Sequence, residues 1–293
     1  MRLHLSLSTF GFAALLAAGL ISLPACDKKA KDTQPDSGPP HQYTGSKGGP
    51  PGGIPVPNPG GMPNTGGQPN DPTLPAPPTP QAQTSNAQTR QISQNNLKQI
   101  GLAFHNAHDT YRGFPTGIAD KSGKTGLSWR VAILPFIEQA DLYKQFKLDE
   151  PWDSENNKKL IAKMPTTYAP PGVTTNGYTY YRSFSGPDAV MPPPVRQVTP
   201  GQAVIGIPLT AITDGTSNTL LVAEAHDPVI WTKPDELSYE KGKAPPKLGG
   251  GVFGDGFNAV FCDGAPHFFK NDLDPTLLGN LINIHDGNIV KLP

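Results

Sequence analysis

The chain has little of the material from which catalytic and metal sites are built. Its 293 residues include two cysteines and seven histidines, which excludes a disulfide framework and leaves little for a zinc site. The 24 Lys and Arg balance the 24 Asp and Glu, so no basic excess is available to hold a nucleic acid. No Gly-x-Ser-x-Gly nucleophile elbow occurs. We therefore predict a protein that is not an enzyme, with no catalytic residue, metal ligand, cofactor or nucleic-acid partner.

The apolar run near the start is also short. Residues 10–23 form 14 apolar or small residues, too few for a helix rising about 1.5 Å per residue to cross about 30 Å of hydrocarbon. The run ends in Leu23-Pro24-Ala25-Cys26, which resembles the lipobox of bacterial lipoproteins. The resemblance implies cleavage after Ala25 and attachment of lipid, including a fatty-acyl chain such as palmitate, to Cys26. Several acyl chains would anchor the protein stably in a membrane.

An ordinary secretory signal with an incidental cysteine is the alternative, because Ala25 suits either peptidase. The polar residues 27–32 favour the lipoprotein, since a tether that begins at a membrane surface should be polar and flexible. Residues 1–25 are thus predicted to be a signal peptide, and the mature protein to face the periplasm or the cell exterior. If Cys26 carries lipid, Cys262 has no disulfide partner and is expected to be a small buried hydrophobe.

Residues 26–88 are predicted to be the lipid-attachment cysteine and a disordered linker rich in proline and glycine. From residue 27 to residue 88 the chain has 15 Pro and 10 Gly, and Tyr43 is the only aromatic residue. Such a segment buries too little apolar surface to offset its conformational entropy. A proline-rich partner motif such as Pro75-Ala76-Pro77-Pro78 is the alternative.

Residues 89–293 have the size of one folded domain. Apolar residues at spacings of three and four predict a first helix that ends at Gly113; they are Leu97, Ile100, Phe104, Ala107 and Tyr111. Residues 129–139 are predicted to form two short helical pieces broken before Pro135. Asp153 is expected to cap a third helix that ends at Met164.

After Pro165 the pattern alternates with period two, which predicts strands at residues 178–184 and 218–224. Residues 257–269 predict a hairpin around a type I′ turn at Asp263-Gly264, and residues 284–290 predict a second hairpin. Between them, Asp274 and Pro275 predict the start of a short helix. Helices followed by antiparallel strands indicate an α+β fold.

Several motifs in order carry a family resemblance. They are NLKQIGLAFHN at 96–106, FP at 114–115, LPFIEQ at 134–139, PWD at 151–153, TDGTSNT at 213–219 and DG at 263–264. In this combination the chain resembles domain of unknown function 1559, a family of pilin-like secreted proteins that has also been filed as solute-binding. The resemblance implies a pilin-like α+β fold. The chain departs from the family in lacking a prepilin leader and in having Phe253 where members commonly have His.

Four groups of residues were weighed as chemical sites, and a structural role is favoured for each. His105 and His108 would share a metal or lie at the edge of a packed helix. Asp214 and Asn218 would bind Ca²⁺ or stabilise a tight turn. The glycines of residues 249–256 would cradle a phosphate or form a mobile loop. Glu224 lies two residues before His226, but no nucleophile is nearby in sequence.

Two functions of different classes remain. The favoured one is a non-enzymatic cell-envelope lipoprotein that displays a structural or adhesive domain on a flexible tether. Its partners would be the membrane, through the lipid anchor, and an envelope protein or glycan. The alternative is a solute-binding lipoprotein that captures a glycan or peptide on exposed aromatic side chains of residues 178–181. A sizeable pocket with convergent polar groups would favour the alternative.

Overall fold

A computed structural model describes residues 72–78, 83–193, 198–288 and 290, all within one compact unit, Pro63–Pro293. The predicted signal peptide, Ala25, Cys26 and most of the linker lie outside the described residues. The α-helices are α1 (Ala87–Tyr111), α2 (Trp129–Ala132), α3 (Ala140–Tyr143) and α4 (Pro275–Ile282), and 3-10 helices cover Leu134–Phe136, Lys158–Lys163, Thr166–Tyr168 and Leu209–Ala211. None of these helices is both long and apolar enough to cross a membrane.

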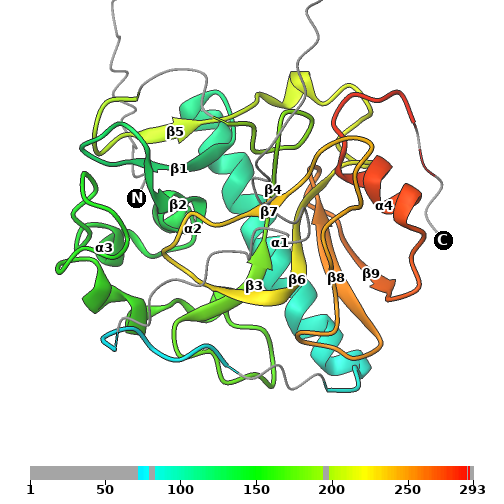
Figure 1. Ribbon diagram of the computed structural model, residues 1–293, viewed down its shortest axis with the longest axis horizontal. Helices are drawn as coiled ribbons and strands as arrows, with labels where there is room; N and C mark the ends of the chain where they lie inside the picture. Colours follow the sequence, from blue (N-terminus) through cyan, green and yellow to red (C-terminus); the bar gives the residue numbers. More distant parts are fainter. Residues whose placement is uncertain (1–71, 79–82, 194–197, 289, 291–293) are drawn as a thin grey trace, which may run out of the picture. The chain divides into compact units, whose positions relative to one another are not determined.

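The strands form two antiparallel sheets and one short parallel pair (Figure 1). The strands are β1 (Pro115–Ala119), β2 (Thr125–Ser128), β3 (Tyr178–Arg182), β4 (Phe184–Ser185), β5 (Ala203–Ile205), β6 (Leu220–Ile230), β7 (Leu237–Ser238), β8 (Gly256–Phe261) and β9 (Pro266–Lys270). The larger sheet has the order β3-β6-β8-β9, the smaller has the order β2-β1-β5, and β4 pairs with β7. The predicted α+β class is confirmed.

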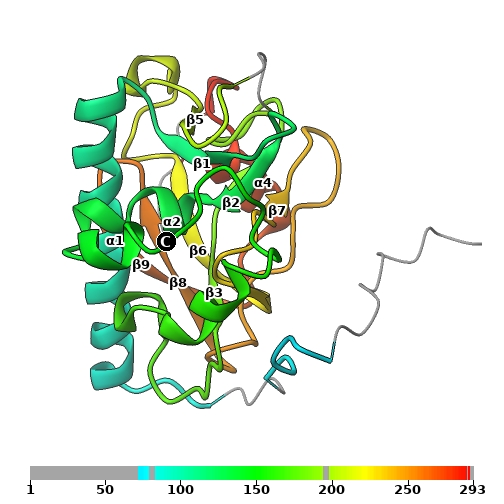
Figure 2. The ribbon, with the colours of Figure 1, turned by 90° about the vertical axis from the view of Figure 1, so that its left-hand side faces the viewer.

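Helix α1 lies along one face of the larger sheet (Figure 2). It begins at a capping box formed by Asn86 and Thr89, and it ends at Arg112, whose left-handed backbone has a φ of 64°. Gly101 allows the helix to approach the β8–β9 hairpin, because a Cβ atom at this position would lie 3.1 Å from the Cα of Gly264. The predicted first helix is therefore confirmed, and its start is set by a cap that precedes the apolar pattern.

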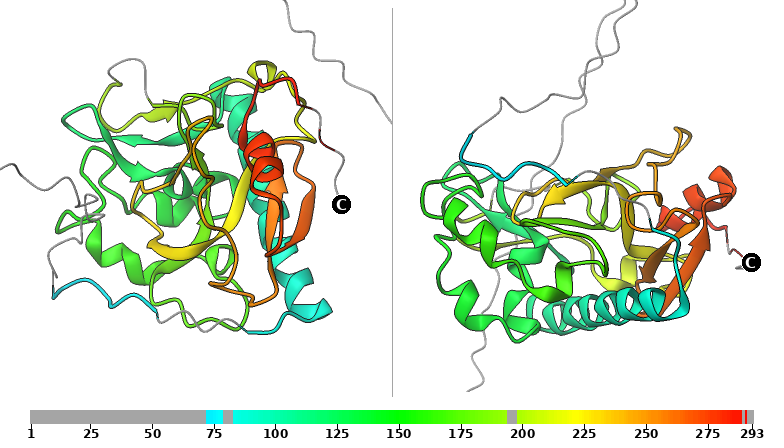
Figure 3. Two further views of the ribbon diagram at one scale, coloured as in Figure 1. Left: turned by 45° about the vertical axis from the view of Figure 1, so that its right-hand side comes forward. Right: turned by 90° about the horizontal axis from the view of Figure 1, so that it is seen from below.

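Two apolar clusters flank the larger sheet. One lies under α1 and extends to β1, β2 and α2, with Leu97, Phe104 and Trp129 fully buried. The other includes Phe257, Phe269 and Leu281 and is covered by α4, which Figure 3 shows from two further sides. Asp274 caps α4 by accepting hydrogen bonds from the N–H groups of residues 276 and 277, as predicted. Cys262 is fully buried, in agreement with its expected role as a small hydrophobe.

The hairpin at residues 257–269 is confirmed, but its predicted turn type is wrong. Of the two turn residues only Gly264 has a positive φ, 86°, whereas a type I′ turn requires two. The carboxylate of Asp263 accepts a hydrogen bond from the N–H of Ala265 at 2.8 Å. The N–H of Gly264 donates to the carbonyl of Phe261 at 2.9 Å. The side chain of Asp263 thus favours a three-residue loop in which only glycine is left-handed.

Two further expectations are wrong. The helix predicted after Asp153 is a 3-10 helix at Lys158–Lys163, and Asp153 does not cap it. Instead, Asn157 donates from its side chain to the carbonyls of Lys147, Glu150 and Pro151, which fixes the preceding loop. Within residues 284–288 no strand forms, because the backbone there hydrogen-bonds to a side chain elsewhere in the fold.

Other elements agree with the sequence in part. The apolar segment that contains Pro135 is broken into α2 and the 3-10 helix Leu134–Phe136, as predicted. The strand predicted at 178–184 is interrupted at Ser183 and continues as β4. The strand predicted at 218–224 begins at Leu220 and is longer than expected, reaching Ile230. Strands β1, β2, β5 and β7 had no counterpart among the predictions.

Replacing Phe253 with alanine should lower the free energy of unfolding by about 3–5 kcal/mol, because the side chain is fully buried and leaves a cavity. Phe253→His should be better tolerated, since the same apolar cluster contains the hydroxyl of Tyr180, which is buried and has no partner in the described structure. Urea denaturation measures both variants. Ile205→Ala, at a residue 39% exposed, is the control and should change stability little. An unchanged midpoint in Phe253→Ala would contradict the prediction.

Candidate functional site

The first half of α1 rests on a row of buried polar side chains. Glu224 on β6 lies opposite Tyr181 on β3, and both residues are buried. Ser93 of α1 donates a hydrogen bond from its hydroxyl to Oε1 of Glu224 at 2.5 Å. The N–H of Asn258 on β8 donates to Oε2 at 2.6 Å. The hydroxyls of Ser93 and Tyr181 are 2.8 Å apart, so one carboxyl group connects the helix to the sheet.

Among the described residues no cation pairs with Glu224, although its environment is closed to solvent. Burial raises the pKa of Glu224 to about 7, while the hydrogen bonds from Asn258 and Ser93 act in the opposite direction. Burial also raises the pKa of Tyr181, and the nearby Glu224 raises it further. Ser93, Tyr181, Glu224 and Asn258 are all buried, so the carboxyl of Glu224 is shielded from solvent on every side.

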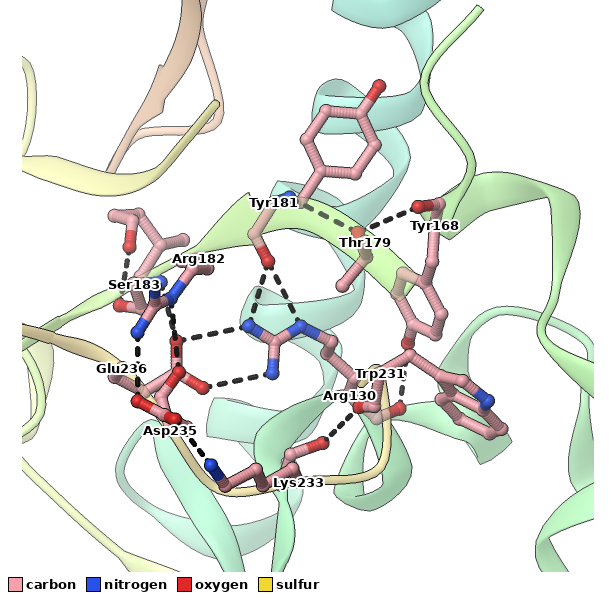
Figure 4. A network of polar contacts seen from close by, with 12 residues as sticks. Arg130, Tyr168, Thr179, Tyr181, Arg182, Ser183, Trp231, Lys233, Asp235 and Glu236 are labelled. Carbon is pink, nitrogen blue, oxygen red and sulfur yellow. Dashed lines mark hydrogen bonds and ion pairs between the residues drawn. The ribbon is translucent and has the colours of Figure 1, made fainter. Parts of the chain in front are cut away.

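A second buried cluster surrounds Arg130 of α2, which has no exposed surface (Figure 4). Its guanidinium donates to the carboxylate of Glu236 at 2.9 and 3.2 Å and to the carbonyl of Tyr181 at 3.0 and 2.8 Å. The guanidinium also lies 4.5 Å from the ring centroid of Trp129. The carboxylate of Glu236 accepts a further hydrogen bond from the N–H of Ser183 at 2.7 Å. Each nitrogen of the guanidinium and each carboxylate oxygen of Glu236 therefore has a hydrogen-bond partner within the protein.

The two clusters meet at Tyr181. Its side chain reaches Ser93, and its carbonyl accepts from Arg130. Sequence reasoning singled out neither Ser93 nor Arg130. The available signal was a lone charged residue inside an apolar run, as in WRVAIL at 129–134 and LLVAEA at 220–225.

His105 and His108 lie at the edge of α1, as the packing interpretation predicts. Both rings pack against the ring of Phe114. The distance between ring centroids is 6.2 Å from His105 to Phe114 and 5.7 Å from His108 to Phe114. Nε2 of His108 accepts a hydrogen bond from the N–H of Leu209 at 3.2 Å. In the part of the chain that the structure describes, no group of three His, Cys, Asp or Glu side chains lies close enough to hold a metal ion.

Asp214 and Asn218 form a turn, and the side chain of Asp214 also binds the backbone of a distant segment. The side chain of Asn218 donates to the carbonyl of Asp214 at 3.0 Å. The two carboxylate oxygens of Asp214 accept from the N–H groups of Asp286 and Gly287 at 2.7 and 2.8 Å. The carboxylate therefore holds the segment after α4 in place, which explains why no strand forms within residues 284–288.

The glycine-rich loop at 249–256 is tied to the chain that precedes α1, whereas a mobile loop was predicted. The carboxylate of Asp255 accepts from the N–H and hydroxyl of Ser85 and from the guanidinium of Arg90. Gln83 pairs with Phe253 as an isolated parallel bridge. These contacts fall on residues 83–90, so the end of the predicted linker contacts the domain.

Two of the three aromatic residues of β3 are not available for stacking on a sugar. Tyr180 and Tyr181 are fully buried, and Tyr178 is only half-exposed. His226 contacts the carbonyl of Gly249 and the amine of Lys247, not Glu224. The expectation of exposed aromatic side chains is therefore wrong for Tyr180 and Tyr181, and the ring of His226 bonds to Gly249 and Lys247 instead of Glu224.

Open clefts of different sizes occur on the described surface. A groove of about 780 Å³ is formed by residues 73–75 with residues 158–177. A cleft of about 660 Å³ lies beside β9 and is lined by Arg90, Phe268 and Leu277, among others. Both are distinct from the buried clusters of Glu224 and Arg130.

A family model described as a protein of unknown function (DUF1559), and also named SBP_bac_10, matches residues 87–251. This is more than half of the chain. The chain belongs to the DUF1559 family. The matched region runs from α1 to the glycine-rich loop, so it includes Arg130 and Glu224 but stops before the β8–β9 hairpin. No curated protein and no solved structure matches the chain. Membership is compatible with an envelope protein.

Replacing Glu224 with glutamine should flatten the dependence of stability on pH. The pKa of the folded carboxyl, about 7, lies above its ordinary 4.5, so the folded state binds a proton that the unfolded chain releases. The contribution of Glu224 is thus fully present below pH 4.5 and is lost as the pH rises through 7. The free energy of unfolding should fall by about 3 kcal/mol over that interval.

Urea unfolding at several values from pH 4.5 to pH 8 measures this change in the wild type and in Glu224→Gln. Glu240→Gln, at a side chain 56% exposed, is the matched control and should keep the wild-type slope. Equal slopes in the wild type and Glu224→Gln would show that Glu224 does not titrate in this range.

Proposed function

We propose that this DUF1559 protein is a non-enzymatic cell-envelope lipoprotein that displays its α+β domain on a tether as a structural or adhesive module. The observation that carries the proposal is that charged side chains inside the domain bond to other groups of the same chain. The side chains of Glu224, Arg130 and Asp214 are all engaged by other groups of the same chain. Function then belongs to the surface of the domain and to its partners, an envelope protein or glycan.

The anchor proposed is lipid on Cys26, after cleavage behind Ala25. The sequence supports it through the Leu-Pro-Ala-Cys motif and the polar residues that follow. The lipid would place the domain at a membrane surface, on the periplasmic or exterior side, and the proline- and glycine-rich residues would act as the tether. A pilin-like origin of the domain fits a long first helix lying on an antiparallel sheet.

Cys26→Ser should move the protein from the membrane pellet to the soluble fraction, because serine cannot form the thioether. Fractionation and immunoblotting measure the distribution, and mass spectrometry of the mature wild type should show the mass of the lipid. Cys262→Ser is the matched control: its thiol is buried in the domain, so this variant should stay with the membrane. A Cys26→Ser protein that still pellets, with no lipid mass on the wild type, would contradict the proposal.

The second candidate is a solute-binding lipoprotein, and the cleft beside β9 favours it. The half-buried ring of Phe268 lies 3.8 Å under the guanidinium of Arg90, and the exposed side chains of Lys270 and Asp272 stand at the rim. An aromatic wall with charges of both signs suits a glycan or a peptide. The family is also named as solute-binding.

A thermal-shift screen of glycans and short peptides against the full chain tests this second candidate. A true ligand of the cleft should raise the unfolding midpoint of the wild type and lose most of that effect in Lys270→Ala/Asp272→Ala. Lys98→Ala, exposed on α1 and outside the cleft, should respond as the wild type does. Shifts that persist in the double variant would place the ligand elsewhere.

A further inference from the structure

Strand β9 is the outermost strand of the larger sheet. In the order β3-β6-β8-β9 it pairs with β8 on one side, and no described strand pairs with its other side (Figure 1). The cleft of about 660 Å³ lies along β9, because its lining includes the consecutive residues 268–270. This cleft therefore borders a strand edge, where backbone groups as well as side chains can meet a ligand.

The register of β8 and β9 shows which backbone groups face that edge. Phe268 lies opposite Asn258, and the N–H of Asn258 points away from β9 because it donates to the carboxylate of Glu224 on β6. The N–H of Phe261 donates to the carbonyl of Ala265 at 3.0 Å, and bonded positions of an antiparallel pair recur in steps of two. Phe268 thus falls at a position whose N–H and C=O point away from β8. No described residue bonds to either group.

The residues beside Phe268 limit how long a segment this edge can pair. Lys270 and Pro266 lie two positions away from it, so their backbone groups also point outward. The carbonyl of Lys270 accepts from the N–H of Leu273, and Pro266 has no N–H to offer. Proline and lysine on an open edge oppose unlimited pairing with other strands. A segment of about five residues, the length of β9 itself, suits the edge.

The two faces beside this edge differ in character. The ring of Phe268 lies on the α1 side, 3.8 Å from the guanidinium of Arg90. The ring of Phe269 lies on the other side, in the apolar cluster that α4 covers. Leu273 and Leu277 are partly buried against that cluster and line the cleft. An added strand sends alternate side chains to the two sides, so every second residue of it would meet this apolar wall.

The charge at one end of the edge selects a partner further. Lys270 is exposed and lies two residues after Phe268, hence on the same face of the strand. An acidic residue directly opposite Lys270 on an added strand would form a favourable cross-strand pair with it. The edge thus presents a backbone pattern, an apolar wall and a positive charge in a fixed order.

We propose that the edge of β9 binds an extended peptide segment of a partner protein, added antiparallel to the sheet, with an acidic residue opposite Lys270 and apolar side chains facing Leu273 and Leu277. Antiparallel addition continues the pairing of the whole larger sheet. Backbone hydrogen bonds at Phe268 supply affinity, and the alternate side chains supply specificity. The inference rests on the second candidate function, because it concerns the same cleft, and it names an extended peptide as the ligand.

Hydrogen exchange by NMR on the isotopically labelled full chain tests the proposal. Without ligand, the N–H of Phe268 should exchange at least about tenfold faster than that of Phe269, which lies at a bonded position. The capped peptides Glu-Val-Thr-Val-Thr and Glu-Leu-Thr-Leu-Thr are the probes. At saturation they should slow exchange at Phe268 and Lys270 by at least about tenfold, because these N–H groups become hydrogen-bonded.

Matched peptides separate backbone pairing from side-chain contact. In the proposed register the third and fifth N–H groups of the peptide face β9, whereas the second and fourth face away. Methylating the third and fifth nitrogens should weaken binding at least about tenfold, and methylating the second and fourth should change it less than about threefold. Replacing the first Glu of the peptide by Lys should weaken binding to the wild type and strengthen binding to Lys270→Glu, each about threefold.

A matched pair of protein variants tests the same edge. Lys270→Pro removes an outward N–H and leaves the bonds between β8 and β9 in place, as proline on an edge strand permits. It should bind the peptides about fivefold more weakly than Lys270→Ala, which loses the same side chain but keeps the N–H. Circular dichroism checks the fold of both variants, and the methylated peptides give the answer on the wild type if Lys270→Pro unfolds.

Four results would overturn the inference. Neither peptide slows exchange at Phe268 at low millimolar concentration, or both methylation patterns weaken binding equally. Protection of Phe268 rises with protein concentration in the absence of peptide, which would make a second copy of the chain the occupant. A glycan stabilises the wild type but not Lys270→Ala/Asp272→Ala, and it leaves exchange at Phe268 unchanged. The last result would leave the second candidate function standing, whereas that function fails only if no ligand of either class acts at the cleft.

Discussion

One buried carboxyl group, that of Glu224, determines how α1 lies on the larger sheet. Apolar contacts under the second half of the helix are non-directional, so they would tolerate a small shift along the axis. The hydrogen bonds of the buried carboxyl with Ser93 and with the N–H of Asn258 are directional, so they would not tolerate such a shift. Tyr181 extends this constraint, because its hydroxyl belongs to the same group while its carbonyl accepts from Arg130. The positions of α1, the sheet and α2 are thus set by one connected set of polar contacts.

The sequence predicted the elements whose signals are local. The apolar spacing of α1, the Asp274-Pro275 cap of α4 and the Asp-Gly hairpin each lie within a few residues. The polar clusters were missed because their partners are far apart: Ser93 and Glu224 are separated by 131 residues. The prediction of a closing hairpin was wrong for the same reason, since the carboxylate of Asp214 binds the backbone of a residue 72 positions away. Spacing along the chain carries no information about such pairs.

The residues expected to be a linker divide into two kinds. Most lie outside the described structure, but residues 72–78 and 83–86 contact the domain through Leu74, Gln83 and Ser85. Composition could not reveal this, because proline and glycine counts average over the whole segment. Leu74 was the local signal for this contact, whereas the alternative prediction concerned residues 75–78 as a motif for a partner. For a DUF1559 protein whose buried charged side chains Arg130 and Glu224 are engaged by other groups of the same chain, such surface contacts are where specificity can reside.

Gln83 attaches the chain that precedes α1 to the domain through two backbone hydrogen bonds. Its N–H donates to the carbonyl of Val252, and its carbonyl accepts from the N–H of Gly254, at 3.2 and 2.9 Å. Ser85 and Arg90 bind Asp255 just beyond this bridge. A pull on the chain upstream of Pro72 would first detach the contacts of residues 73–75 and then act along the Gln83 bridge. Helix α1, and the carboxyl of Glu224 that Ser93 of this helix contacts, would bear load only after these contacts had yielded.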